Sequence, residues 1–143
     1  MMKKKVWSLV IATVFSLLTF LIPGCAMNRV DLVDAGMLSL EQHNTGKVYI
    51  AWSGAYEQDD GFVITGVLRR RDRVGMAIRT HVDVTVLSQE GTILDEARSL
   101  DVYVARRITG RSYLSFERFK VRFPNIPAKN SLVRLVSYSG RHN

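Results

Sequence analysis

The chain has 143 residues, with 20 Lys and Arg against 13 Asp and Glu and a formal net charge of +7. This length suits one domain of ordinary size and is too short for two. The chain holds a single cysteine, so the fold must rest on its hydrophobic core and not on disulfides.

The first 25 residues have the layout of a secretory signal peptide. Three lysines at 3–5 precede an uncharged run at 6–22, and a small residue then precedes Cys25. The segment Ile22-Pro23-Gly24-Cys25 resembles the lipobox of bacterial lipoproteins, although Pro23 departs from that pattern. The resemblance implies that residues 1–24 are removed and that the Cys25 thiol carries a diacylglycerol. The alternative is an ordinary signal peptide with an incidental cysteine.

The chain that remains after this cleavage is moderately basic. Its 119 residues contain 17 Lys and Arg against 13 Asp and Glu, a net charge of +4. This charge favours anionic surfaces such as phospholipid or lipopolysaccharide headgroups, and it is too small to predict nucleic-acid binding. Under the sorting rule that comes with the lipoprotein resemblance, Ala26 implies the cell outer membrane, with the domain facing the periplasm. In a Gram-positive organism the same anchor implies the cell membrane.

Residues 25–46 have no sustained hydrophobic period, and we expect them to form a lipidated tether with a short helix near Ala35 to His43. The folded domain is expected over 47–143.

The first strands are predicted from residue 47 onward. Val48, Ile50 and Trp52 alternate with other residues as in a strand, and 62–68 is apolar on both faces, which favours a central strand. Gly66 within it indicates a bulge or a close neighbour. Turn residues lie in the connection between these two segments, at Ser53-Gly54 and Asp59-Asp60-Gly61.

The clearest strand pattern covers Met76 to Leu87. One face carries Met76, Ile78, Thr80, Val82, Val84 and Val86, and the other carries Arg79, His81, Asp83 and Thr85. Such alternation is typical of an antiparallel sheet with one buried face. Ser88 to Gly91 then forms a four-residue hairpin connection to a partner strand at 92–97.

Three further strands are predicted at 100–104, 113–123 and 132–138. In the second of these, Phe119, Val121 and Phe123 share one face, and Arg118, Lys120 and Arg122 share the other. About seven or eight short strands without a helical period predict an all-β fold, a single antiparallel β-sandwich.

This layout is similar to small immunoglobulin- or fibronectin-III-like periplasmic domains, including the FxLYD type. The similarity lies in the strand at 82–87 that runs into Gln89-Glu90-Gly91, and in the late strand at 119–123. Leu87-Ser88 stand where the FxLYD pattern has Tyr-Asp. The resemblance implies a sandwich fold and transfers no active site.

No motif predicts catalysis, a metal or a cofactor. The three histidines, His43, His81 and His142, have no ligand spacing, and His81 is expected on the solvated strand face. The acidic pair Asp59-Asp60 lies in a turn, and Asp95-Glu96 point to opposite faces of a strand. We therefore do not expect an enzyme.

Arginines form the strongest candidate site. Arg69, Arg70, Arg71 and Arg73 are expected in one charged loop, and Arg106 and Arg107 in a second. Guanidinium groups bind phosphates and carboxylates in a bidentate manner. The alternative is a solvated surface that discourages edge-to-edge pairing of strands.

An aromatic platform is a second possibility. Tyr49, Trp52 and Tyr56 would form a sugar- or peptide-contacting surface, but the alternation of Trp52 with Val48 and Ile50 favours a core position for Trp52.

We expect a lipid-anchored cell-envelope protein with a non-catalytic accessory role. It would dock to another envelope component, most simply a protein partner, by a surface patch or by strand addition. The alternative is a module that binds a small ligand, an anionic lipid or a glycan with its arginine-rich loops.

Overall fold

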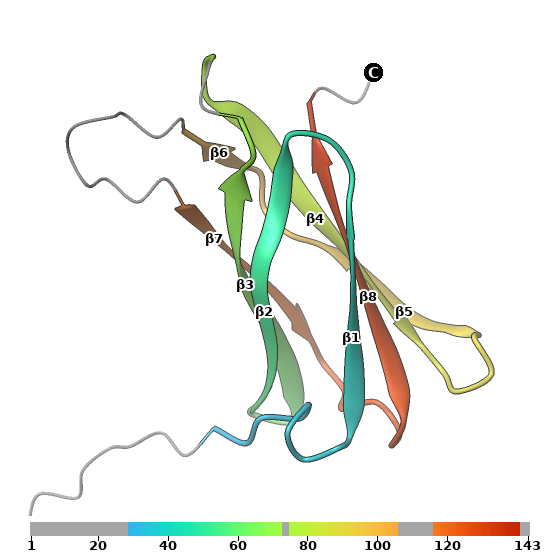
Figure 1. The fold of residues 1–143 in the computed structure, drawn as a ribbon. Helices are drawn as coiled ribbons and strands as arrows, with labels where there is room; N and C mark the ends of the chain where they lie inside the picture. Colours follow the sequence, from blue (N-terminus) through green and yellow to red (C-terminus); the bar gives the residue numbers. More distant parts are fainter. Residues whose placement is uncertain (1–28, 73–74, 106–115, 141–143) are drawn as a thin grey trace, which may run out of the picture.

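The structure, a computed structural model, describes residues 29–72, 75–105 and 116–140. In these residues eight strands form two sheets that face each other, which confirms the predicted all-β sandwich (Figure 1). The strands are β1 (Leu38–Asn44), β2 (Val48–Gln58), β3 (Gly61–Arg70), β4 (Ile78–Leu87), β5 (Ile93–Arg98), β6 (Val102–Val104), β7 (Phe116–Phe123) and β8 (Ser131–Ser139).

The five-stranded sheet is built around β4, which pairs with three other strands. β8 pairs with β4 along one edge. Along the other edge, β6 pairs with the beginning of β4 and β5 pairs with its end. β1 lies beside β8 and runs parallel to it, whereas the other strand pairs described are antiparallel.

The second sheet has β3 in the middle, between β2 and β7. This confirms the central strand predicted at 62–68. Gly66 does have a close neighbour, because a Cβ placed on it would lie 2.5 Å from the Phe119 ring and 2.5 Å from the Trp52 carbonyl oxygen. The absence of a side chain here lets β2, β3 and β7 pack tightly.

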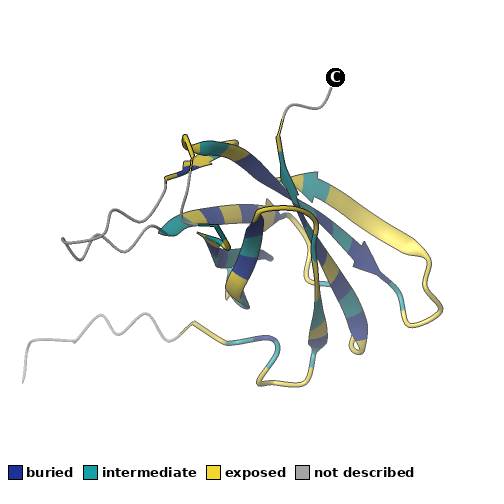
Figure 2. Ribbon diagram, turned by 45° about the horizontal axis from the view of Figure 1, so that its top comes forward, coloured by how far each residue is buried: buried dark blue, intermediate teal, exposed yellow. Residues whose placement is uncertain are grey.

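The core lies between the two sheets. Alternate residues of β4 and β7 face it, as Figure 2 shows by the alternating colours along these strands. Val84 and Phe119 are 1% and 3% exposed, as the alternation predicts. The Phe62 ring stacks on Phe123 with 4.8 Å between the ring centroids. These contacts join β3 to β7 and supply the apolar burial that holds the sandwich together.

The connection from β4 to β5 is the predicted hairpin. The Ser88 N–H donates to the Thr92 carbonyl at 2.8 Å, and the Gly91 N–H donates to the Ser88 carbonyl at 3.0 Å. Gly91 has a φ of 84°, which glycine adopts without steric cost.

The helix predicted near 35–43 is wrong, because Leu38–Asn44 form strand β1. β1 pairs with β8 from Leu38↔Ser131 to Asn44↔Ser137, and Leu32 and Leu38 are buried in the core. The described part of the predicted tether therefore belongs to the sandwich, and the folded unit begins before residue 47. Burial of these apolar side chains outweighs the weak local preferences of the segment.

The predicted core position of Trp52 is also wrong. The pairing of β2 with β3 shifts between Ile50 and Trp52, which is a β-bulge, and β2 continues through the predicted turn at Ser53-Gly54. A bulge adds one residue to one strand and so reverses the faces beyond it. Ile50 is 3% exposed, whereas Trp52 is 49% exposed.

Two other apolar residues lie outside the strands predicted for them. β4 begins at Ile78, and Met76 before it is 89% exposed. β6 contains only Val102–Val104, and Leu100 before it is 85% exposed.

Candidate functional site

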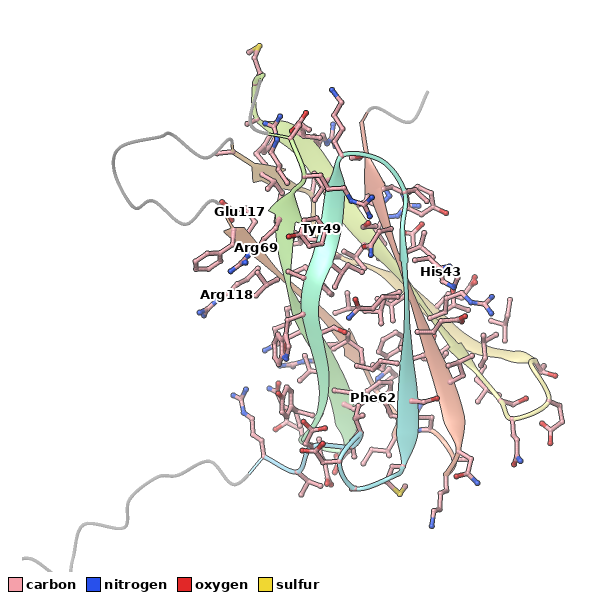
Figure 3. The ribbon with its side chains drawn as sticks, in the orientation of Figure 1. His43, Tyr49, Phe62, Arg69, Glu117 and Arg118 are labelled. Atoms are coloured by element: carbon pink, nitrogen blue, oxygen red, sulfur yellow. The ribbon has the colours of Figure 1, made fainter. Side chains whose placement is uncertain are left out.

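The outer surface of the three-stranded sheet gathers aromatic and basic side chains. Strand register sets this surface, because residues paired across neighbouring strands point to the same side. Four rows run across the sheet, namely Tyr49–Arg69–Phe116, Trp52–Val67–Arg118, Gly54–Thr65–Lys120 and Tyr56–Val63–Arg122. We call this surface the basic–aromatic face, and its basic and aromatic members are Tyr49, Trp52, Tyr56, Arg69, Arg71, Phe116, Arg118, Lys120 and Arg122. In Figure 3, Arg69 and Arg118 both extend from the sheet on the side away from the core.

The aromatic members from β2 follow from the bulge and from a glycine. The bulge turns Trp52 outward, as described above. A Cβ on Gly54 would lie 2.8 Å from the Tyr56 hydroxyl and 3.0 Å from Cε2 of its ring. The Tyr56 ring therefore lies along the strand, over Gly54, and does not project into solvent.

The basic members come mainly from β7. Arg118, Lys120 and Arg122 are exposed, as the sequence predicts. The Arg118 guanidinium lies 5.9 Å from the centroid of the Phe116 ring, and the Arg71 guanidinium lies 5.7 Å from that of Tyr49. Both distances fall within the range of cation–π attraction.

These cations are not neutralised by neighbouring acids. Among the described residues, no carboxylate forms an ion pair with Arg69, Arg71, Arg118, Lys120 or Arg122. The face therefore has a net positive field that an anion would meet directly.

The predicted arginine loop is divided by the structure. Arg69 and Arg70 belong to β3, and they point to opposite sides of it. The side chain of Arg70 is 2% exposed, and it donates to the Asp72 carboxylate and to the Met76 carbonyl. Arg70 thus holds the β3–β4 connection in place, while Arg69 and Arg71 belong to the basic–aromatic face.

The hydrogen bond from Arg70 lowers the pKa of Asp72 below its usual 3.8, and Lys47 adds to this effect. Of the other predicted site residues, Cys25, Arg73, Arg106 and Arg107 lie outside the part of the chain that is described.

The outer face of the five-stranded sheet is different, because its charges are paired with one another. Three arginines contact acids on adjacent strands or connections, in the pairs Arg134–Glu41, Arg98–Asp83 and Arg79–Asp101. The hydrogen bond from Arg134 lowers the pKa of Glu41, and that from Arg79 lowers the pKa of Asp101. We call this surface the charge-paired face.

A groove of about 460 Å³ lies on the charge-paired face. Its lining residues are Asp83, Val84, Thr85, Glu96, Ala97, Arg98, Val136 and Tyr138. Asp83 and Arg98, the central charges in it, bind each other at 2.6 Å. A charged ligand would have to break this pair before it could use either group.

His81 stacks on Tyr138, which lines this groove, and the prediction that His81 lies on a solvated surface is wrong. It is 6% exposed, because the Tyr138 ring stacks on it at 5.6 Å between ring centroids. Its Nδ1 lies 3.5 Å from an Asp101 carboxylate oxygen, and its Nε2 lies 3.8 Å from Asp83. A strand pattern gives the side of the sheet on which a residue lies, but not how far a neighbouring ring covers it.

No three His, Cys, Asp or Glu side chains of the described residues lie together as a metal site would require. Nor does the described part contain a helix that is long and apolar enough to cross a membrane. No family model, curated protein or solved structure shows a significant match to this chain.

Proposed function

We propose that this chain is a lipid-anchored, non-catalytic binding protein of the bacterial cell envelope. The membrane anchor is the lipid expected on Cys25, and Ala26 after it favours the outer membrane, with the domain facing the periplasm. Docking to another envelope component occurs through the basic–aromatic face.

The observation that carries this proposal is the grouping on one sheet surface of four aromatic rings with five cations that form no ion pair within the described residues. Guanidinium groups bind phosphate or carboxylate groups in a bidentate manner, and aromatic rings add contact area and orientation. On the charge-paired face, positive and negative side chains pair with one another, so it has no comparable excess of positive charge. The partner is therefore an anionic component of the envelope.

Strand addition at the edge strand β5 is less well supported. Ile93 and Leu94 are about half exposed, and β5 is exposed along most of its length (Figure 2). However, the Glu96 N–H already donates to the Asp95 carboxylate at 2.8 Å. Acidic side chains on an exposed edge strand oppose the addition of another strand.

Photo-crosslinking in the native host tests the proposal. A benzophenone-bearing amino acid replaces Thr65, in the middle of the basic–aromatic face, and in a control chain it replaces Thr85, in the middle of the charge-paired face. Both threonines are half-buried residues on the outer side of a central strand. We expect crosslinked products from position 65, and fewer of them when Lys120→Gln is added.

Products from position 85 with none from position 65 would contradict the proposed face. The absence of products from both positions would contradict docking through either sheet surface.

A further inference from the structure

Building on the proposed function, we infer that the basic–aromatic face binds an acidic polysaccharide, which lies as an extended chain along β3. The aromatic row of β2 contacts the sugar rings, and the basic row of β7 contacts the acidic groups.

The first argument is the shape of the surface. The floor between the two rows is formed by Thr65 and Val67, which are half-buried and short, and it ends at Val63, which is 0% exposed. From Thr65 to Arg69 the strand advances about 13 Å, and the three strands together are about 10 Å wide. This is the shape of a track for a chain molecule and not of a pocket for a small ligand.

The second argument is the orientation of the rings. The hydroxyl end of the Tyr56 ring lies over Gly54, so the ring lies along the strand and does not project from the sheet. The flat face of an aromatic ring carries partial negative charge and packs against the C–H groups of a pyranose ring. A ring that inserts into a bilayer must project from the surface, which Tyr56 does not do.

The third argument is the repetition of charge. Arg118, Lys120 and Arg122 point to the same side of β7, and the Cα atoms of neighbouring members are about 7 Å apart along the strand. A regular row of cations matches a polymer that carries an acidic group at regular intervals. Arg69 and Arg71 extend the positive field at one end of the face.

Calorimetry with the full chain in a non-ionic detergent tests the inference. The probes are phosphorylated dextran, uncharged dextran, inorganic polyphosphate, and mixed micelles of detergent and phosphatidylglycerol. We expect phosphorylated dextran to bind about tenfold more tightly than either dextran or polyphosphate, because it alone uses both rows.

Matched variants separate the contributions of the two rows. Trp52→Ala should weaken binding of phosphorylated dextran about tenfold and leave polyphosphate unchanged, whereas Lys120→Gln should weaken both. Gly54→Ala should act like Trp52→Ala, because the added methyl group displaces the Tyr56 ring. The controls are Tyr103→Ala, an exposed aromatic on β6, and Lys129→Gln, an exposed lysine outside the face.

Equal affinity for polyphosphate and phosphorylated dextran would overturn the polysaccharide inference and leave the proposed anionic docking in place. Tightest binding to the phosphatidylglycerol micelles, dependent on Trp52, would assign the face to the membrane surface instead. Failure to bind any anionic probe would overturn both the inference and the proposed function.

Discussion

Gly66 is a residue of β3 at which a neighbouring backbone and a neighbouring ring both approach closely. Gly66→Ala would place a methyl group 2.5 Å from the Phe119 ring and from the Trp52 carbonyl oxygen. Because the carbonyl belongs to the backbone, the strands must separate, and we expect the free energy of unfolding to fall by about 1–3 kcal/mol. Urea denaturation followed by circular dichroism measures this loss.

Gly54→Ala is the matched control for Gly66→Ala. The atoms that a methyl group would meet there belong to the Tyr56 side chain, which can rotate away. We expect a loss below about 1 kcal/mol. If both variants unfold at the same urea concentration as the wild type, this result would contradict the close packing of β2 and β7 around Gly66.

Asp72 makes stability depend on pH in the acid range. Its pKa in the folded protein lies below the usual 3.8 because Arg70 donates hydrogen bonds to its carboxylate. The stabilisation is therefore fully present above pH 3.8, and it is lost as the pH falls through the lower folded-state pKa. We expect Asp72→Asn to be less stable than wild type near neutral pH and to approach it in acid.

The measurement for Asp72 is urea denaturation of both proteins from pH 7 down to the acid limit of folding. Asp60→Asn, which removes an exposed carboxylate in the β2–β3 turn, is the control and should show no such convergence. A constant difference between wild type and Asp72→Asn at every pH would contradict the role of this ion pair.

At the scale of elements, β1 is the strand that decides where the folded unit begins. Leu38→Asp would bury a carboxylate at a position that is 4% exposed. We expect a loss of about 3 kcal/mol or more, measured by thermal and urea unfolding. Ser39→Asp, one residue further and exposed, should cost below about 0.5 kcal/mol. Equal stability of the two variants would show that β1 does not contribute to the core.

The strands that could be predicted from the sequence are those with one buried and one solvated face. β4 and β7 carry this alternation in their own residues, so Val84, Phe119 and Lys120 were assigned to the correct sides. β1 could not be predicted in the same way. Its partner β8 lies 93 residues further along the chain, and no local pattern encodes a parallel pairing over that distance.

The candidate site was only partly predictable, for a related reason. In the sequence its members form separate groups of arginines and of aromatic residues. The pairing register of β2, β3 and β7 brings these groups together on one surface. The bulge before Trp52 changes the side on which that residue lies, and no residue type in the sequence marks it. The sequence places Arg70 in one group with Arg69 and Arg71, because the three residues are consecutive and carry the same charge. Adjacent residues of a strand point to opposite sides, so Arg70 lies away from the face that Arg69 and Arg71 share.

At the scale of the whole molecule, the two outer faces differ in electrostatic character. Arginines on one sheet are neutralised by Glu41, Asp83 and Asp101, whereas the basic–aromatic face has no such partners among the described residues. Surface ion pairs contribute little stability, so the first arrangement is compatible with a solvated surface. The second leaves its charge available to a partner.

The membrane attachment that we propose for the whole molecule rests on Cys25. We expect Cys25→Ser to abolish incorporation of a fatty-acid analogue during metabolic labelling, and to release the protein from the membrane fraction. Each buried acyl CH₂ contributes about 0.8 kcal/mol to attachment, so loss of the chains removes the anchor. Equal labelling of wild type and Cys25→Ser would contradict the lipobox interpretation.

The parallel pairing of β1 with β8 also limits how early β1 can join the fold. Synthesis proceeds from the N-terminus, so β1 emerges well before residues 131–137. Until those residues emerge, β1 has no strand to pair with and Leu38 has no complete core to enter. Contacts this distant in sequence also form slowly. β1 can therefore enter the sandwich only after the strands between it and β8 have been made.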